Sequence, residues 1–309
     1  MLRYLFVRIL RALVTITLVA TFAFIVLRLS GDPAMIILGP DAPMQAVENF
    51  RKAWGLDQPI WVQYVAYVGA IFEGDLGVSM RDGRSAVELV GERIPATLAL
   101  TIPALLIKLL IGIPAGVYAA LNRDSFIDRA VMVTAIIGFT MPSFVIGLIL
   151  VLVFSVILGW LPSGGQDGWM HAILPISTMG IGGAAILARF TRSAMIEILG
   201  QPYIRTASAK GVSWARVVRG HALPNAAIPI VTIVGFMVGT LVAGAVVVES
   251  VFSWPGVGRL LVIAVSNRDL AVVQCILLLV AATMVVSNLV VDVLYGYLDP
   301  RLRDGRAKA

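Results

Sequence analysis

Apolar residues gather in six long runs along the chain, and polar or charged segments separate these runs. A helix needs about 20 predominantly apolar residues to cross the hydrocarbon core of a bilayer. The runs that reach this length cover residues 9–29, 97–121, 130–157, 173–195, 225–250 and 272–297. This pattern predicts an all-α membrane protein with six transmembrane helices.

Two of the runs carry features that change how they are interpreted. The first follows Arg3, Arg8 and Arg11, as the apolar core of a signal peptide does. It exceeds the usual length of about 7–15 residues, however, and no small-x-small cleavage site precedes Gly31. We therefore interpret it as a retained membrane anchor. The third run holds Pro142, which predicts a kink or a tilt in that helix.

The composition agrees with lipid as the solvent of this chain and narrows its possible functions. Hydrophobic residues make up 59% and charged residues 14% of the 309 positions, against about 45–50% and about 25% in a typical soluble domain. The single cysteine, Cys275, excludes an intrachain disulfide, and the two histidines lie too far apart in sequence to suggest a metal site. Since the sequence also lacks a Gly-rich phosphate loop and a Gly-x-Ser-x-Gly motif, it does not predict an enzyme.

The distribution of lysine and arginine predicts the orientation of the helices. The amino end, the loops 122–129 and 189–224, and the carboxyl tail together hold 15 of these residues. The opposite side holds eight, and five of them lie in the long segment 30–96, where charge biases orientation weakly. Because cytoplasmic loops carry the excess of positive charge, both chain ends are expected in the cytoplasm. The net charge of +6 has the same explanation, and we expect no nucleic-acid partner.

The segment between the first and second runs is expected to form a small periplasmic region with short helices. Apolar residues recur at helical spacing over 44–54, and again over 60–72 after Pro59, a good helix-start residue. These apolar stripes pack on each other or lie on the outer membrane surface, and the sequence leaves both open. The predicted organisation is a membrane anchor (1–30), a periplasmic segment (31–96), a five-helix core (97–300) and a cytoplasmic tail (301–309).

The loop 196–224 is polar and basic, and its residues predict a definite shape. Residues 203–210 offer about two turns of good helix formers, and Gly211 permits a sharp reversal because glycine enters positive φ without strain. Ser213 can cap a second short helix, and Pro224 stands where the fifth run begins. We expect a short helix held crosswise below the membrane. It either docks a partner protein or lies on anionic lipid, and the residues alone leave both open.

The same loop carries a resemblance to a known family. It reads Arg205-Thr-Ala, three residues, Gly211, a spacer, and then Leu223-Pro224. The spacing and the glycine resemble the cytoplasmic signature of ABC importer permeases, which runs Glu-Ala-Ala, three residues, Gly, a spacer and Leu-Pro. The Glu and the first Ala of that signature are absent here.

Further blocks narrow the resemblance to one branch of that family. They are Arg-Leu-Ser-Gly-Asp-Pro (28–33), Gly-Asp-Leu-Gly-Val-Ser (74–79), Arg-Ile-Pro-Ala-Thr-Leu (93–98), Tyr-Ile-Arg-Thr-Ala-Ser-Ala-Lys-Gly (203–211), Val-Val-Glu-Ser-Val-Phe-Ser-Trp-Pro-Gly-Val-Gly-Arg-Leu-Leu (247–261) and Leu-Asp-Pro-Arg (298–301). These blocks run from end to end in order. They resemble the dipeptide, oligopeptide and nickel permeases, and most of all the dipeptide-system permease that has a large periplasmic segment after its first span.

The resemblance implies an architecture and a set of partners. It implies a type I ABC importer permease in the bacterial inner membrane, with no cofactor of its own. It also implies a second homologous permease, two ATPase subunits that bind ATP and magnesium, and a periplasmic or lipid-anchored substrate-binding protein. The solute is expected to be a di- or oligopeptide; the alternatives are nickel or another small solute on the same architecture, or an ion-driven secondary transporter.

The resemblance implies that seven residues of the loop contact the ATPases. These ATPase-coupling candidates are Tyr203, Arg205, Thr206, Ala207, Lys210, Gly211 and Pro224. Motion of a docked ATPase would then reach the two membrane helices that flank the loop.

Three residues within the apolar runs are candidates for the translocation path. Lys108 is a cation near the middle of its run, where it either attracts a substrate carboxylate or pairs with a backbone carbonyl or a partner chain. Met141 precedes Pro142 at a possible flexible break. Glu249 lies near the outer end of the fifth run, where it either gates the outer mouth or is simply solvated at headgroup level, and we favour solvation.

Two small-residue patterns predict close helix contacts. Gly112-x-x-x-Gly116 and Gly235-x-x-x-Gly239 let helices approach closely. Packing inside the chain and a seam with a second permease are both open.

Overall fold

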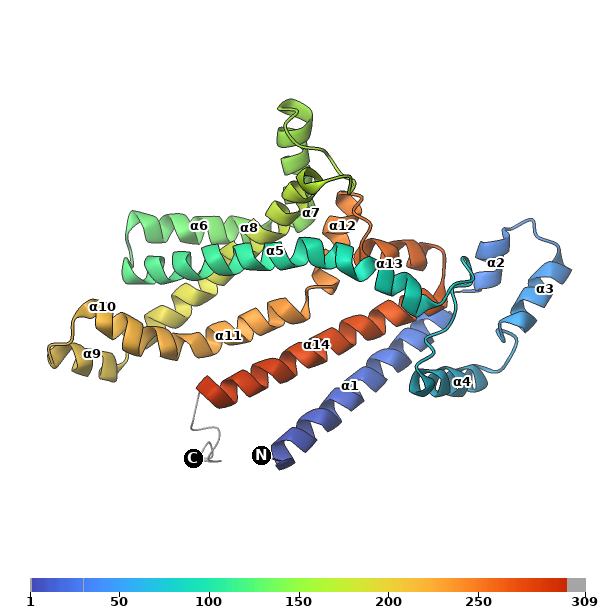
Figure 1. Ribbon diagram of the computed structural model, residues 1–309, viewed down its shortest axis with the longest axis horizontal. Coiled ribbons are helices and arrows are strands. Elements are labelled where there is room, and N and C mark those ends of the chain that lie inside the picture. Colours follow the sequence, from blue (N-terminus) through green and yellow to red (C-terminus); the bar gives the residue numbers. More distant parts are fainter. Residues whose placement is uncertain (1, 30, 299–309) are drawn as a thin grey trace. The chain divides into compact units, whose positions relative to one another are not determined.

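The computed structural model describes residues 2–29 and 31–298. The tail predicted over 301–309 lies outside them. The described residues form helices joined by turns, with no strand among them (Figure 1). The α-helices are α1 Leu2–Leu29, α2 Pro33–Leu38, α3 Met44–Ala53, α4 Ile60–Glu73, α5 Ala86–Leu121, α6 Phe126–Thr140, α7 Ser143–Leu150, α8 Trp169–Leu199, α9 Pro202–Ala209, α10 Trp214–Val217, α11 Leu223–Gly239, α12 Val246–Val251, α13 Val257–Ser266 and α14 Leu270–Leu298. The turns η1 Val151–Ile157 and η2 Val218–Ala222 are π-helical, and η3 Ala243–Ala245 is a 3₁₀ turn.

Five helical stretches of the described chain are long and apolar enough to cross a membrane, and a bent pair raises the number to six if it counts as one span. The five are Val7–Leu29, Ala86–Leu121, Trp169–Leu199, Trp214–Gly239 and Leu270–Leu294. The all-α membrane fold predicted from the sequence is therefore confirmed. The third predicted run, 130–157, forms a span only if the two helices of this bent pair are counted together.

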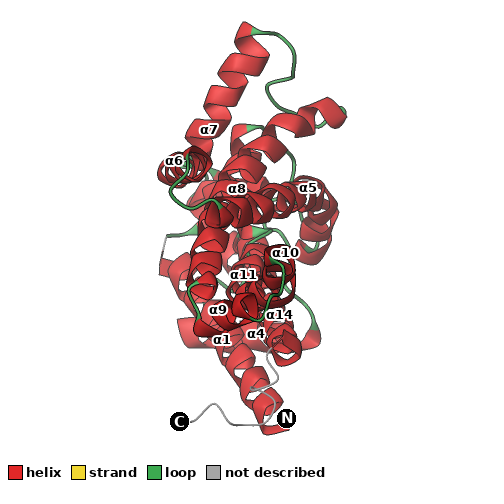
Figure 2. Ribbon diagram, turned by 90° about the vertical axis from the view of Figure 1, so that its left-hand side faces the viewer, coloured by secondary structure: helices red, strands yellow, loops and turns green. Residues whose placement is uncertain are grey.

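The break in that pair lies at Met141–Pro142. The helices α6 and α7 with its continuation meet there at 102°, and Figure 2 shows α6 end-on while α7 rises away from it. Met141 is extended, with φ −81° and ψ 123°. The residue before a proline is pushed out of the helical region by the pyrrolidine ring, which explains why the helix ends here. The kink predicted at Pro142 is thus a full change of direction.

The fifth predicted run, 225–250, is not one helix. The helix α11 ends at Gly239, and the chain then continues through η3 into α12. At the end of α11 the Thr240 hydroxyl donates to the carbonyls of Phe236 and Met237, at 3.0 and 3.2 Å. A hydroxyl that bonds to the preceding turn in this way competes with the regular backbone ladder. A hydropathy pattern does not reveal this interruption, because residues 240–245 are all apolar or small.

The contacts divide the chain into two compact units, which we describe separately. The core unit comprises Leu98–Trp254 and the described part of Met284–Ala309. The flanking unit comprises Leu2–Thr97 and Pro255–Thr283.

Glycines set the spacing of the core unit, in which α8 packs against α5, α6 and α11 (Figure 1). A methyl group on Gly116 would lie 2.4 Å from the Ala188 carbonyl oxygen, and one on Gly112 would lie 2.8 Å from that of Ala184. Likewise, a methyl group on Gly235 would meet Val291 of α14 at 1.9 Å. Both small-residue patterns therefore pack inside the chain.

Replacing Gly116 by leucine is expected to push α5 away from α8 and to lower the unfolding temperature of the detergent-purified chain. The nearest obstacle is backbone, which cannot turn aside, and overpacking typically costs about 1–3 kcal/mol. Gly69 of α4 has no atom within 4 Å of its added carbon, so Gly69→Leu is the matched control. Equal unfolding temperatures for the two variants would contradict this packing.

In the flanking unit α4 packs on α1 through aromatic rings. Phe24 is buried, stacks on Tyr67 with ring centroids 5.5 Å apart, and meets Tyr64 edge-on at 5.4 Å. Beside this contact face, α4 leaves Trp61 and Phe72 exposed. The stripe over 60–72 thus packs partly against α1 and leaves other large apolar side chains exposed.

Candidate functional site

The loop between α8 and α11 has the two short helices and the glycine reversal that its sequence predicts, but not the predicted Ser213 cap. Pro202 occupies the first turn of α9, where a missing backbone N–H costs nothing. After α9 the chain reverses at Gly211, whose φ of +80° lies in the left-handed region. The Gly211 N–H donates to the Ser208 carbonyl at 3.0 Å and so closes the end of the helix. Ser213 stands at the start of α10 but makes no side-chain capping bond.

One face of α9 is anchored to the membrane helices. Ile204 is fully buried and packs in one apolar cluster with Met195 of α8 and Val217 of α10. Ala120 of α5 and Ala226 of α11 belong to the same cluster. The buried face of α9 thus shares one apolar cluster with residues of the three long helices α5, α8 and α11.

The other face of the loop is exposed, basic and aromatic. Tyr203 is 42% and Trp214 53% exposed, and Arg205, Lys210 and Arg216 are exposed beside them. Exposed aromatic and arginine side chains are typical of protein interfaces. Sequence reasoning missed Trp214 and Arg216. Their position in the sequence, shortly after the reversal at Gly211, could have identified them.

The seven coupling candidates do not share one environment. Six are exposed: Tyr203, Arg205, Thr206, Lys210, Gly211 and Pro224. Ala207 is half-buried and packs on the apolar cluster, so it faces the membrane helices. The Thr206 hydroxyl donates to the Pro202 carbonyl at 3.0 Å, which ties it to its own helix. Pro224 lies in the first turn of α11, beyond η2.

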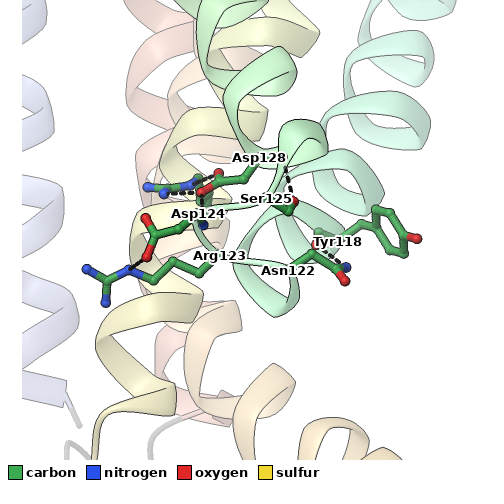
Figure 3. Close-up of polar contacts among 7 residues, drawn as sticks. Tyr118, Asn122, Arg123, Asp124, Ser125 and Asp128 are labelled. Carbon is green, nitrogen blue, oxygen red and sulfur yellow. Dashed lines mark hydrogen bonds and ion pairs between the residues drawn. The ribbon is translucent and has the colours of Figure 1, made fainter.

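A buried ion pair braces the turn between α5 and α6 against α8 (Figure 3). Both nitrogens Nε and Nη2 of Arg192 donate to the Asp128 carboxylate, the latter at 2.6 Å. The Asp124 N–H donates to the same carboxylate at 2.9 Å, and the Asp128 N–H donates to the Ser125 hydroxyl at 3.2 Å. The Asp128 side chain is 4% and that of Arg192 19% exposed. The sequence holds no local signal for this pair, since its members are 64 positions apart.

The three path candidates lie on different elements of the core unit. Lys108 is half-buried on α5, and Met141 is half-buried at the break between α6 and α7. Glu249 lies on α12 and is 0% exposed, which overturns the expectation that it is solvated. It sits beside Val248, which packs with Leu174 of α8 in an apolar cluster. Tertiary packing of α12 thus buries a carboxylate that hydropathy places at the membrane surface.

The described residues offer no group of three or more His, Cys, Asp or Glu side chains arranged to hold a metal ion. The geometry defines a helical membrane protein in which the loop between α8 and α11 is packed on one face and exposed on the other.

Comparison with known proteins gives the family. Residues 112–304 match the family described as "Binding-protein-dependent transport system inner membrane component", and residues 1–101 match the N-terminal model of the same system. The chain belongs to this family. It is the inner-membrane permease subunit of a binding-protein-dependent ABC importer, in the peptide and nickel branch.

Relatives cover nearly the whole chain. The "Glutathione transport system permease protein GsiC" of Escherichia coli (strain K12) is 44% identical over 304 residues, 98% of this chain and 99% of the relative. The protein of the same name from Salmonella choleraesuis (strain SC-B67) gives the same identity and coverage.

Solved structures share the fold. One is the inward-facing MetNI methionine ABC transporter, with a TM-score of 0.57 at 23% identity over 69% of this chain and 97% of that chain. Another is an amino acid ABC transporter with histidines, with a TM-score of 0.53 at 19% identity over 67% of this chain and 93% of that one. The type I importer permease architecture is thereby confirmed.

Proposed function

We propose that this chain forms half of a transmembrane path for di- or oligopeptides and is driven by ATPase subunits that dock on the loop around α9. The solute class is supported by the GsiC relatives, which are 44% identical and named for glutathione, itself a small peptide. A second homologous permease would supply the other half of the path. Two ATPases would bind and hydrolyse ATP with magnesium, and an external binding protein would deliver the solute.

One observation carries the coupling role: α9 is buried on one side and presents aromatic and basic residues on the other. In this proposal Tyr203, Arg205, Thr206 and Lys210 contact the ATPase. Gly211 sets the reversal that holds α9 in place. Ala207 and Pro224 pass the motion to the apolar cluster and to α11.

The energy for gating has to arrive through this loop. Taking a two-state gate from 1:99 to 99:1 requires about 5.5 kcal/mol of differential binding. The sequence carries no phosphate-binding loop that would supply it from nucleotide. Lys108, Met141 and Glu249 are proposed to line or control the path that opens, with Glu249 acting as a buried element of the outer gate.

Reconstitution tests the proposal. Proteoliposomes with both permeases, the ATPases and the binding protein should take up a labelled dipeptide only with ATP. Excess Ni²⁺ should not compete, and excess unlabelled dipeptide should. Uptake that persists without the ATPases would instead establish an ion-driven transporter, and competition by Ni²⁺ alone would establish the metal as the solute.

The proposed orientation puts both chain ends and the α9 loop in the cytoplasm. In a Cys275→Ala background, Thr206→Cys on α9 and Trp61→Cys on α4 provide two exposed positions for a membrane-impermeant maleimide. We expect Trp61→Cys to react in spheroplasts and Thr206→Cys to react only after permeabilisation. The reverse pattern would overturn the orientation and, with it, docking at α9.

A further inference from the structure

Lys108 is a charged residue held at the middle of two packed membrane helices. It is the one charged side chain in the apolar run 97–121, on α5, which spans Ala86–Leu121. A cation at this depth costs about 2.5–3.5 kcal/mol on insertion scales unless something compensates it. Lysine often avoids this cost by extending its stem along the helix to the headgroups.

In this structure the stem of Lys108 does not run along its own helix but lies across the backbone of α8 at Gly183. A methyl group on Gly183 would lie 2.4, 2.6 and 2.8 Å from Cε, Cδ and Cγ of Lys108. Three consecutive carbons therefore stay at the level of Gly183, which is itself near the middle of α8 (Trp169–Leu199). The next turn of α8 makes the same kind of contact, since Gly180 faces Ile107. This slot holds the three stem carbons of Lys108 beside the middle of α8.

The described part of the chain offers this ammonium no anion. No ion pair or hydrogen bond of Lys108 is found there. The buried carboxylate of Asp128 in the same unit is already taken by Arg192. Lys108 is half-buried rather than fully enclosed, so part of the residue remains accessible. Among the described residues no ion pair neutralises this charge, which leaves it available to a negatively charged group of the solute.

We propose that Lys108 binds the carboxyl-terminal carboxylate of the peptide as it passes, and that Gly183 is the residue that keeps its slot open. This inference rests on the proposed function and specifies its solute class as molecules with a free carboxylate. Every unmodified peptide carries this group. A metal cation would be repelled, so the same residue separates peptides from nickel within one architecture. Because the contact is a single charged hydrogen bond, it orients the solute without trapping it.

The test compares a dipeptide with its carboxyl-terminal amide in the reconstituted importer, at saturating loaded binding protein. The uptake rate of each variant is divided by the wild-type rate for the same solute, so that any selectivity of the binding protein cancels. Lys108→Met should lower uptake of the free acid about ten- to a hundredfold, the size expected for one hydrogen bond to a charged group, and lower uptake of the amide much less, because a neutral carboxamide is a weaker partner for an ammonium group. Lys108→Arg should retain uptake of the free acid, because it keeps the positive charge. Lys108→Glu should take up less free acid than Lys108→Met, because it repels the carboxylate.

A neighbouring pair of glycines provides a control that leaves the lysine in place. Gly183→Ala should displace the stem and reproduce the selective loss. Gly182→Ala should cause no selective loss, because a methyl group there makes only ordinary contacts, the nearest at 3.8 Å. Unchanged uptake by Lys108→Glu would overturn the proposal, as would equal loss of acid and amide in Lys108→Met. If Lys108→Met loses uptake of acid and amide equally and also fails to co-purify the second permease, then the negative partner of Lys108 lies on that permease and the proposal is wrong. Failure of the proposed function looks different, since the wild type would then take up no peptide or need no ATP.

Discussion

Replacing Gly211 by valine is expected to abolish uptake while the chain still inserts in the membrane. Gly211 has φ +80°, a region in which a β-branched residue is strongly disfavoured. No atom lies within 4 Å of the carbon that the substitution adds, so the effect is conformational rather than a clash. Strain of this kind costs about 1–3 kcal/mol. The reversal after α9 would then open, and the exposed face of α9 would no longer meet the ATPase in its proper orientation.

The measurement pairs ATP-dependent uptake with the amount of chain in the membrane and the ATPase activity that loaded binding protein stimulates. Gly211→Asn is the first control, because asparagine tolerates the left-handed region and should retain most uptake. Gly220→Ala is the second, since Gly220 is exposed in the same loop, has no positive φ and has open space around it. Normal uptake by Gly211→Val would contradict the role of α9 as the coupling element.

Replacing Arg192 by methionine is expected to destabilise the core unit more than any exposed charge substitution. It leaves the Asp128 carboxylate buried without its partner, and breaking a buried pair from one side typically costs about 3–5 kcal/mol. Because Arg192 is itself 19% exposed, we expect the lower end of this range. The turn between α5 and α6 would separate from α8 close to where α8 leads into α9.

Thermal unfolding in detergent measures this loss, and Asp128→Asn should lower the unfolding temperature in the same direction. Arg84→Met is the matched control, since its pairs with Glu88 and Glu92 are exposed and such pairs contribute little. If Arg192→Met unfolds at the same temperature as Arg84→Met, the pair is not a brace. We also expect reduced coupling in Arg192→Met, seen as fewer solutes carried per ATP hydrolysed.

Local features of this chain were readable from its sequence because each depends on a few neighbouring residues. The apolar runs report the solvent of a helix directly, so the membrane class and most spans were predicted correctly. The reversal at Gly211 and the start of α9 at Pro202 follow from the backbone preferences of glycine and proline. The motif spacing around them identified the permease family, which the comparisons confirm.

Contacts between residues that are distant in the sequence could not be predicted from local patterns. Asp128 meets Arg192 across 64 positions, and Gly183 meets Lys108 across two helices. Glu249 is buried because α12 packs on α7 and α8, although its local sequence suggests a solvated carboxylate. The run over 225–250 is interrupted at Thr240 without any change in hydropathy. Local composition and backbone preference therefore predict the apolar membrane helices and the reversal at Gly211. The tertiary structure decides which charges are paired, buried or exposed, because folding brings together side chains that are distant in the sequence.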